Sequence, residues 1–251
     1  MFKASPFEYR FRFAIHGLIY ILGFIAPWVY IPFIANNLHL TSDSTLLVLP
    51  LSLARIGWLP AYSRTTGYVM LAIALLFTTL GAWFRAWGSA YVGSGVVKSS
   101  SMHGEAMLAD GPFRHTRNPL YLGTLLHTLG IALLMPPSGA VFAVVLLWIF
   151  QFRLALAEEP FLLARFGQQY ATYAAKVPRF LPMFFPQVPA AGASPHWLQA
   201  ILGEFYFIGV VIVIAAFGWD FNRTPLWQGI VIAFGLSIVL RAFLPKPPSV
   251  T

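Results

Sequence analysis

The sequence carries a short segment, residues 111–123 (GPFRHTRNPLYLG), whose residue types suit the binding of an anion. Asn118 stands directly before Pro119, and this pair favours a helix start because Asn caps a helix and Pro fits its first turn. The free backbone N–H groups of such a start attract negative charge, and Arg114 and Arg117 add positive charge beside it. The alternative is a capped helix whose arginines only flank a membrane.

Tyr121 and Gly123 extend this candidate site into the same helix. Tyr121 lies one turn beyond the helix start, on the side of Asn118. Gly123 has no side chain, so a ligand or a neighbouring helix can approach its backbone closely. A ligand at this helix start is therefore expected to meet backbone and side-chain groups together.

A second cluster, Arg153 with Glu158 and Glu159, stands where a long apolar run ends. Two adjacent carboxylates are unusual in a chain with only eight acidic residues. Paired acids can bind an amine or a ribose diol, or position a proton. The alternative is a second helix that starts at Pro160, with Glu159 as its cap and Arg153 as counter-ion. Together the two clusters predict a site for a ligand that carries charges of both signs.

The composition indicates a membrane protein. Of the 251 residues, 58% are hydrophobic and 10% are charged, whereas a soluble domain has about a quarter charged residues. The net charge of +8 fits positive flanks of membrane helices, and we expect no nucleic-acid partner. The chain has no cysteine, which excludes disulfides, thiolate metal ligands and a Cys nucleophile, and we expect no metal site.

Apolar runs of bilayer length predict an all-α, polytopic membrane protein with about six transmembrane helices. Residues 46–60 are apolar but short, and they could be a seventh span or a re-entrant segment. With six spans, all basic residues except Arg55, Arg64 and Arg223 fall on the side of the N-terminus, so we expect both termini and the site to be cytoplasmic. The expected spans are residues 13–35, 66–87, 119–135, 138–157, 197–217 and 226–243.

The two clusters belong to one expected core, residues 66–182. A helical hairpin over residues 119–157 brings both clusters to the same face of the membrane. Residues 161–176 mix aromatic and charged side chains, which is typical of an amphipathic helix on the membrane surface. Before the core, residues 1–65 hold the first span and an outer loop or re-entrant segment. After it, residues 183–251 hold a linker and two C-terminal spans.

In their order, these motifs resemble the integral-membrane methyltransferases of the isoprenylcysteine carboxyl methyltransferase and phospholipid methyltransferase group. That family carries Gly-Pro-(Tyr/Phe)-Arg-x-x-Arg-His-Pro-x-Tyr-x-Gly, then a Glu-Glu pair, then Phe-Gly-x-x-Tyr-x-x-Tyr. Here the pieces are residues 111–123, 158–159 and 166–173, and the match continues into residues 177–182. The resemblance extends over residues 81–182.

The resemblance implies an S-adenosylmethionine-dependent methyltransferase in the membrane. Its methyl acceptor would be a lipophilic or isoprenoid molecule that enters from the bilayer lipids, similar to an isoprenylcysteine carboxylate or a phospholipid. Arg153 would face the acceptor, and Glu159 would position it. The residues implied to hold the cofactor are Arg117, Asn118, Tyr121, Gly123, Glu158 and Glu159.

The sequence departs from the family pattern at two positions. Asn118 stands where the family has His, and an amide cannot titrate, so an acid–base role is lost there. Arg153 lies five residues before Glu158, where the family spacing is four, and one residue turns a helix by about 100°. The spacing therefore weakens the role implied for Arg153.

Two other classes of function remain open at the level of the residues. One is an NADPH-dependent membrane reductase related to sterol reductases, which would need more basic residues for the extra phosphates. The other is a non-enzymatic membrane scaffold that keeps the fold. Binding of S-adenosylhomocysteine, of NADPH or of neither by folded protein discriminates the three classes.

Overall fold

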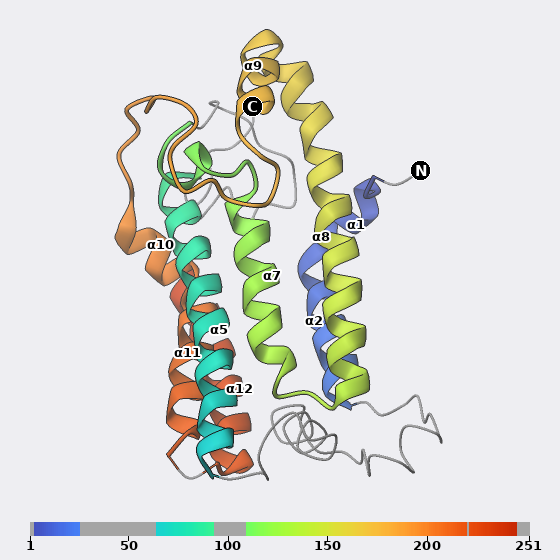
Figure 1. Ribbon diagram of the computed structural model, residues 1–251, viewed down its shortest axis with the longest axis vertical. Coiled ribbons are helices and arrows are strands. Elements are labelled where there is room, and N and C mark those ends of the chain that lie inside the picture. The colour runs from blue at the N-terminus through green and yellow to red at the C-terminus, as the bar shows by residue number, and fades with distance from the viewer. Residues whose placement is uncertain (1–2, 26–63, 93–108, 220, 245–251) are drawn as a thin grey trace.

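The computed structural model describes residues 3–25, 64–92, 109–219 and 221–244. In this part of the chain the structure is helical without strands, which confirms the all-α prediction. Figure 1 shows an elongated bundle with short helices gathered toward one end. The bundle consists of α2 (Arg12–Ile25), α5 (Arg64–Val92), α7 (Pro119–Ala132), α8 (Pro137–Phe166), α11 (Phe205–Phe217) and α12 (Arg223–Arg241). The short helices are α1 (Pro6–Arg10), η1 (Gly111–Arg114), α9 (Gln168–Lys176) and α10 (Trp197–Gly203).

Two described helices, α5 and α8, are long and apolar enough to cross a membrane. The pair α10 and α11 makes a third candidate span with a bend of 65° between its parts. The helices α2, α7 and α12 are apolar but shorter. The expected number of six spans stays a prediction, and the expected segment at residues 46–60 lies outside the described residues.

Small residues let α5 and α7 pack with their backbones almost in contact. A Cβ atom added to Gly81 would lie 2.5 Å from the backbone nitrogen of His127, and one added to Gly130 would lie 2.5 Å from the carbonyl oxygen of Ala74. Such close approach is possible only for residues without a side chain, and it is typical of helix pairs in membranes. It fixes the start of α7, and with it residues 111–123, against the end of α5.

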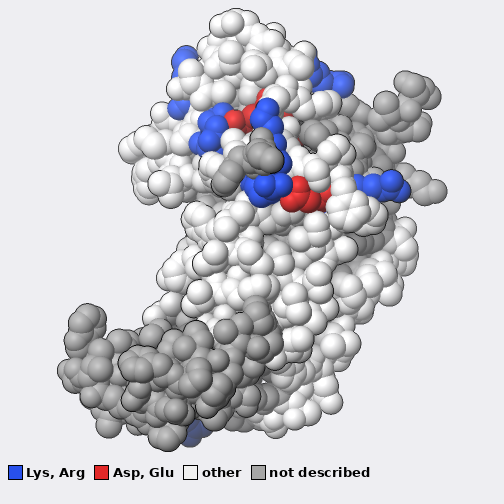
Figure 2. All heavy atoms as spheres, turned by 90° about the vertical axis from the view of Figure 1, so that its right-hand side faces the viewer, with Lys and Arg blue, Asp and Glu red and all other residues white. Residues whose placement is uncertain are grey.

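The apolar core joins α2, α5, α7, α8, α11 and α12 into one bundle. Leu147 and Ile214 are fully buried in this core, on α8 and α11. Figure 2 shows that the charged side chains of one face gather near the end that carries α1 and α9, above a long body with almost none. A charge-poor body with a charged end is what a membrane-embedded bundle requires.

Two sequence expectations about helix boundaries were wrong, and a third differs from the structure by a bend. Pro160 starts no new helix but lies inside α8, so Glu159 is not a cap. A proline removes only one backbone hydrogen bond, and α8 continues through Pro160 to Phe166. The expected helix over residues 161–176 is divided at Gly167, where φ is +52°, between the end of α8 and α9. The expected span over residues 197–217 is bent at Glu204.

Candidate active site

A cavity of about 1050 Å³ runs through the bundle, which is large enough for a cofactor-sized ligand and part of a second molecule. Its charged end lies beside the start of α7 and the end of α8, and its lining there includes Arg117, Glu158 and Glu159. Its other end is apolar, and the walls there come from α2 and α12. The apolar lining includes Phe24, Trp227, Ile230, Val231 and Phe234.

Glu158 is the centre of the charged end. Its Oε1 accepts hydrogen bonds from the hydroxyls of Tyr9, at 2.8 Å, and Tyr121, at 2.6 Å. Burial, together with the nearby Glu158 charge, raises the pKa of Tyr9, so its hydroxyl stays protonated and donates. The two hydroxyl donors favour the ionised form of Glu158 and oppose the effect of its burial, and a cationic ligand beside this carboxylate would favour the ionised form further.

Glu159 has different surroundings. Its Oε1 lies 3.0 Å from Nη1 of Arg117 and 2.7 Å from Nε of Arg179, and its Oε2 lies 2.8 Å from Nη2 of Arg179. These hydrogen bonds raise the pKa of Arg179 above its usual value. One carboxylate between two guanidinium groups leaves a net positive charge, so this side of the cavity suits an anion.

Arg117 also carries an unmet donor. Its Nε is buried and has no hydrogen-bond partner among the described residues. A buried donor without a partner costs about 1–3 kcal/mol, which a ligand that accepts its hydrogen bond would recover. Arg117 lines the cavity, so such a ligand would lie at the charged end.

The structure places Arg153 away from the cavity. Its Nη2 donates to both oxygens of Glu8, at 3.0 and 2.8 Å, and Arg153 is not among the residues that line the cavity. The expected ion pair with the acidic pair Glu158 and Glu159 is therefore wrong, since Glu8 takes its place. The role implied for Arg153 toward the acceptor stays a prediction, one that this position does not favour.

Asn118 and Gly123 also have structural partners. The side-chain amide of Asn118 donates to the carbonyl of Arg179 at 3.0 Å and makes no capping hydrogen bond, so the expected Asn cap is wrong. Asn118 nevertheless lines the cavity. Gly123 faces α5, where an added Cβ would lie 2.7 Å from the carbonyl oxygen of Gly81. The sequence analysis predicted that a ligand or a neighbouring helix approaches Gly123, and the structure shows the neighbouring helix.

The segment of residues 111–123 contacts the segment that follows the acidic pair. The backbone N–H of Arg117 donates to the carbonyl of Pro178 at 2.8 Å, and the hydroxyl of Tyr173 donates to the carbonyl of Phe113 at 2.8 Å. Tyr170 and Tyr173 are buried on α9, and burial raises the pKa of both hydroxyls. They therefore form a neutral wall over the charged end of the cavity.

Two residues of this site escaped the sequence analysis. Tyr9 reaches Glu158 because α1 folds back onto α8: the N–H of Ala4 donates to the carbonyl of Arg153 at 3.1 Å, and Ser5 and Glu8 form a capping box. Arg179 follows the α9 helix in a loop and pairs with Glu159. The sequence contains only a weak indication of Tyr9. It is the Ser-Pro-x-Glu pattern of a helix start at residues 5–8, directly before Tyr9.

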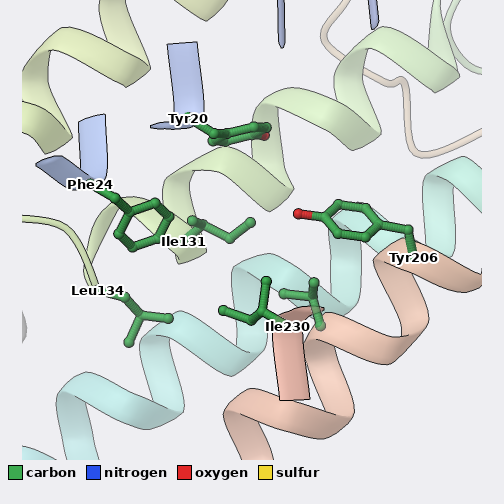
Figure 3. Close-up of a pocket in the computed structure, with 7 residues that line it drawn as sticks. Tyr20, Phe24, Ile131, Leu134, Tyr206 and Ile230 are labelled. Carbon is green, nitrogen blue, oxygen red and sulfur yellow. The ribbon is translucent and has the colours of Figure 1, made fainter. Parts of the chain in front are cut away.

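A smaller pocket of about 30 Å³ adjoins the apolar end. Its lining includes Tyr20, Phe24, Tyr206 and Ile230, which also line the large cavity. Figure 3 shows that Tyr206 points its hydroxyl inward from α11 while Ile131 and Leu134 close the other side. This pocket has room for no more than a small group, so it fits the end of a lipophilic ligand rather than a whole one.

Fold and cavity together define a helical membrane protein with a charged ligand site that opens into an apolar chamber. Residues 64–169 match the family model described as phospholipid methyltransferase. The chain is also 31% identical over 115 residues to the protein-S-isoprenylcysteine O-methyltransferase of Schizosaccharomyces pombe, a match that covers 44% of this chain and 48% of that protein. These matches support the family that the motifs indicated, and the family model matches residues 64–169 of this chain.

A second relative is the cobalt-zinc-cadmium resistance protein CzcN of Cupriavidus metallidurans, 22% identical over 156 residues, with 59% of this chain and 67% of that protein covered. The chain spans about half the length of the yeast relative and two thirds of the bacterial one. In the described ranges no group of three His, Asp or Glu side chains is placed to hold a metal ion. No solved structure matches the chain.

Proposed function

We propose that the protein is an S-adenosylmethionine-dependent methyltransferase that acts on a lipophilic acceptor within the membrane. The observation that carries this proposal is that, within the described part of the chain, a buried, unsatisfied donor and a partly buried carboxylate without an arginine partner lie at one end of an apolar cavity. Arg117 offers a buried donor without a partner, and Glu158 offers a carboxylate held by two tyrosine hydroxyls. A ligand with a carboxylate and a cationic group would satisfy both.

The residues present fit such a cofactor. When bound, S-adenosylmethionine supplies a methyl group on a positively charged sulfur. In our proposal Arg117 binds its carboxylate, Glu158 holds a cationic group, and Asn118 and Tyr121 line the same end of the cavity. Glu159 stabilises the ionised arginines on either side of it and so positions Arg117. Because both oxygens of Glu159 are taken up by Arg117 and Arg179, we favour this positioning role for Glu159. Direct contact with the cofactor and service as a general base are less well supported.

Methyl transfer to a nucleophile needs position more than acid–base help. The cavity supplies position by holding two ligands in one chamber, with the charged end closed by Tyr170 and Tyr173. Exclusion of water by these buried rings strengthens the charge interactions inside. The chain's own residues therefore orient the ligands and hold charge.

The apolar length of the cavity suits the acceptor. Ile21 on α2 and Val231 on α12 line the cavity, yet they are 60% and 68% exposed. Side chains that are both lining and exposed mark a lateral opening, and an apolar opening in a membrane bundle faces lipid. We propose that the acceptor enters there and that it carries a long apolar chain, as do the isoprenylcysteine and phospholipid in the names of the yeast relative and of the family.

The reductase and scaffold alternatives find less support. Both the family match and the yeast relative are methyltransferases by name. Glu159 between Arg117 and Arg179 leaves the net positive charge of a single arginine, which suits one carboxylate better than the several phosphates of NADPH. The methyltransferase is therefore the function that the site supports best.

Methyl transfer into a lipid extract tests the proposal. Purified protein is incubated with S-adenosylmethionine labelled in its methyl group and with total membrane lipids, and label is counted in the organic phase. We expect label to appear with the wild type and to fall strongly in Tyr121→Phe, which removes one hydroxyl from Glu158. Equal label with heat-inactivated protein would refute the proposal.

A further inference from the structure

A second cluster of polar side chains lies inside the bundle, and it includes neither Glu158 nor Glu159. Arg85 on α5 and Glu204 at the bend between α10 and α11 form an ion pair of 2.8 Å, with their side chains 9% and 1% exposed. Arg85 also donates from Nη1 to the hydroxyl of Thr124 at 3.2 Å and lies over the ring of Phe207. Arg85, Thr124 and Glu204 all line the large cavity.

The geometry of this ion pair is one-sided. Nε and Nη2 of Arg85 both contact Oε2 of Glu204, at 2.8 Å each. Oε1 of Glu204 is buried and has no hydrogen-bond partner in the described part of the chain. An arginine and a carboxylate commonly pair through both oxygens, so the free Oε1 is an acceptor left open in a buried place. An open buried acceptor is costly unless a ligand donates to it.

A second open acceptor lines the same cavity. Nδ1 of His16 contacts the carbonyl of Arg12 and must donate, so its Nε2 accepts the hydrogen bond from the side-chain amide of Gln151 at 2.8 Å. That leaves Oε1 of Gln151, which has no partner among the residues described. The deeper part of the cavity therefore presents acceptors, at Glu204 and Gln151, and it calls for a ligand with a donor.

The charge balance narrows the ligand further. Arg85 and Glu204 neutralise each other, so a charged headgroup beside them would be buried without a counter-ion. A carboxylate would also bring no donor to Oε1 of Glu204. A hydroxyl brings a donor without a charge. Thr124 lies one turn deeper in α7 than Tyr121, about 4.5 Å along the helix axis, so a group bound here would lie close to the charged end.

We infer that Arg85, Thr124 and Glu204 form a headgroup subsite for the lipophilic acceptor, and that this headgroup is a neutral hydroxyl, as in a long-chain alcohol or phenol, which donates to Oε1 of Glu204. On methyl transfer the acceptor oxygen would gain the methyl group in place of its proton, the proton would pass to Oε1 of Glu204, and S-adenosylhomocysteine would be the leaving group. This inference rests on the proposed function for the identity of the ligand as the methyl acceptor. The subsite itself is separate from the cofactor residues. Glu204 also lies outside residues 64–169, the family segment of the chain.

The test compares amphiphiles with one tail and different headgroups. Native mass spectrometry of detergent-purified full-length protein gives apparent Kd values for dodecanol, dodecylamine and dodecanoate without cofactor. We expect dodecanol to bind at least about tenfold more tightly than either charged probe, as one hydrogen bond to a buried carboxylate provides. Equal or tighter binding of dodecanoate or dodecylamine would overturn the inference.

Variants of Glu204 test whether this side chain causes the preference for dodecanol over the charged probes. Glu204→Gln should reduce the preference for dodecanol at least about fivefold, which is part of the effect of one such hydrogen bond. Because this change leaves Arg85 buried without its partner, the double variant Arg85→Met/Glu204→Leu replaces the whole pair by apolar groups and keeps the test valid if the single variant does not fold. Thr78→Val, which removes buried hydrogen bonds to the carbonyls of Ala74 and Leu75 within α5 at a residue that does not line the cavity, is the control. An unchanged preference in the folded Glu204 variants would overturn the inference.

Titration of S-adenosylhomocysteine separates this inference from the proposed function. If wild-type protein binds no S-adenosylhomocysteine, the proposed function fails whatever the headgroup result. If it binds and the headgroup preference is absent, only the subsite fails. We expect Glu204→Gln to retain wild-type affinity for S-adenosylhomocysteine within about threefold, because Glu204 lies apart from Arg117 and Glu158.

Discussion

Replacement of Glu158 by Gln isolates the charge at the centre of the site. In the wild type the hydroxyls of Tyr9 and Tyr121 donate hydrogen bonds to Oε1 of Glu158 at 2.8 and 2.6 Å. The side-chain carbonyl of the Gln variant can still accept these hydrogen bonds. The fold around α1 and α7 is therefore expected to survive, while the negative charge is lost. Hydrogen bonds to charged groups contribute about 1.5–3 kcal/mol, so binding of a cationic ligand group should weaken about 10- to 150-fold.

Isothermal titration calorimetry with two ligands reads out this loss. S-adenosylmethionine and S-adenosylhomocysteine both carry an ammonium group, but only the former carries a sulfonium. If Glu158 meets the sulfonium, the variant loses more affinity for S-adenosylmethionine than for S-adenosylhomocysteine. If it meets the ammonium, both affinities fall alike.

The control for this experiment is Asp110→Asn, which removes a carboxylate that accepts the backbone N–H groups of residues 191–193 and does not line the cavity. It should leave both affinities within about twofold of the wild type, since distant sites act independently. Unchanged affinity of folded Glu158→Gln for both ligands would refute the role given to Glu158. Circular dichroism and the thermal midpoint establish that each variant is folded.

Three further predictions concern the scaffold. The ion pair with Arg153 holds the pKa of Glu8 below its usual range. The pair therefore stabilises the fold by about 0.2–1 kcal/mol at neutral pH, and this stabilisation is lost as the pH falls through the pKa of Glu8 in the folded state. The thermal midpoints of the wild type and of Glu8→Gln should accordingly converge at low pH. Gly81→Ala should lower the thermal midpoint by the equivalent of about 1–3 kcal/mol, because the new Cβ would lie 2.5 Å from the backbone of α7, whereas Gly235→Ala, with open space around it, should not. Asp110→Asn should speed proteolysis near residues 191–193, whose three backbone N–H groups donate to the Asp110 carboxylate, and an unchanged cleavage rate would contradict this clamp.

The motif residues that lie close in sequence predicted much of the site. The start of α7 at Pro119 and the acidic pair at the end of α8 follow from local patterns, and the helical hairpin between them brings Arg117 to Glu159. Residue type and helical spacing decide these features, so one sequence is enough to predict them.

Long-range partners could not be predicted in the same way. Tyr9 is 149 residues from Glu158, and Arg85 is 119 residues from Glu204. Nothing in a local pattern says which tyrosine or arginine a carboxylate will meet after the bundle has packed. Arg153 shows the converse error, since its nearness in sequence to Glu158 suggested an ion pair that the fold gives to Glu8 instead.

Helix continuity was the other source of error. Pro160 and the apolar run over residues 197–217 were judged by local rules for helix starts and span lengths. In the structure, α8 continues through Pro160, and the bend at Glu204 lets this residue reach Arg85. The contact between Glu204 and Arg85 is a tertiary feature that the local rules do not contain.

Calorimetric titration of S-adenosylhomocysteine into detergent-purified protein, with NADPH titrated in parallel, tests the central claim most directly. The account predicts micromolar binding of S-adenosylhomocysteine with one ligand per chain and no binding of NADPH. Binding of NADPH alone, or of neither ligand by protein that is folded, would contradict the assignment of the charged cavity to a methyltransferase.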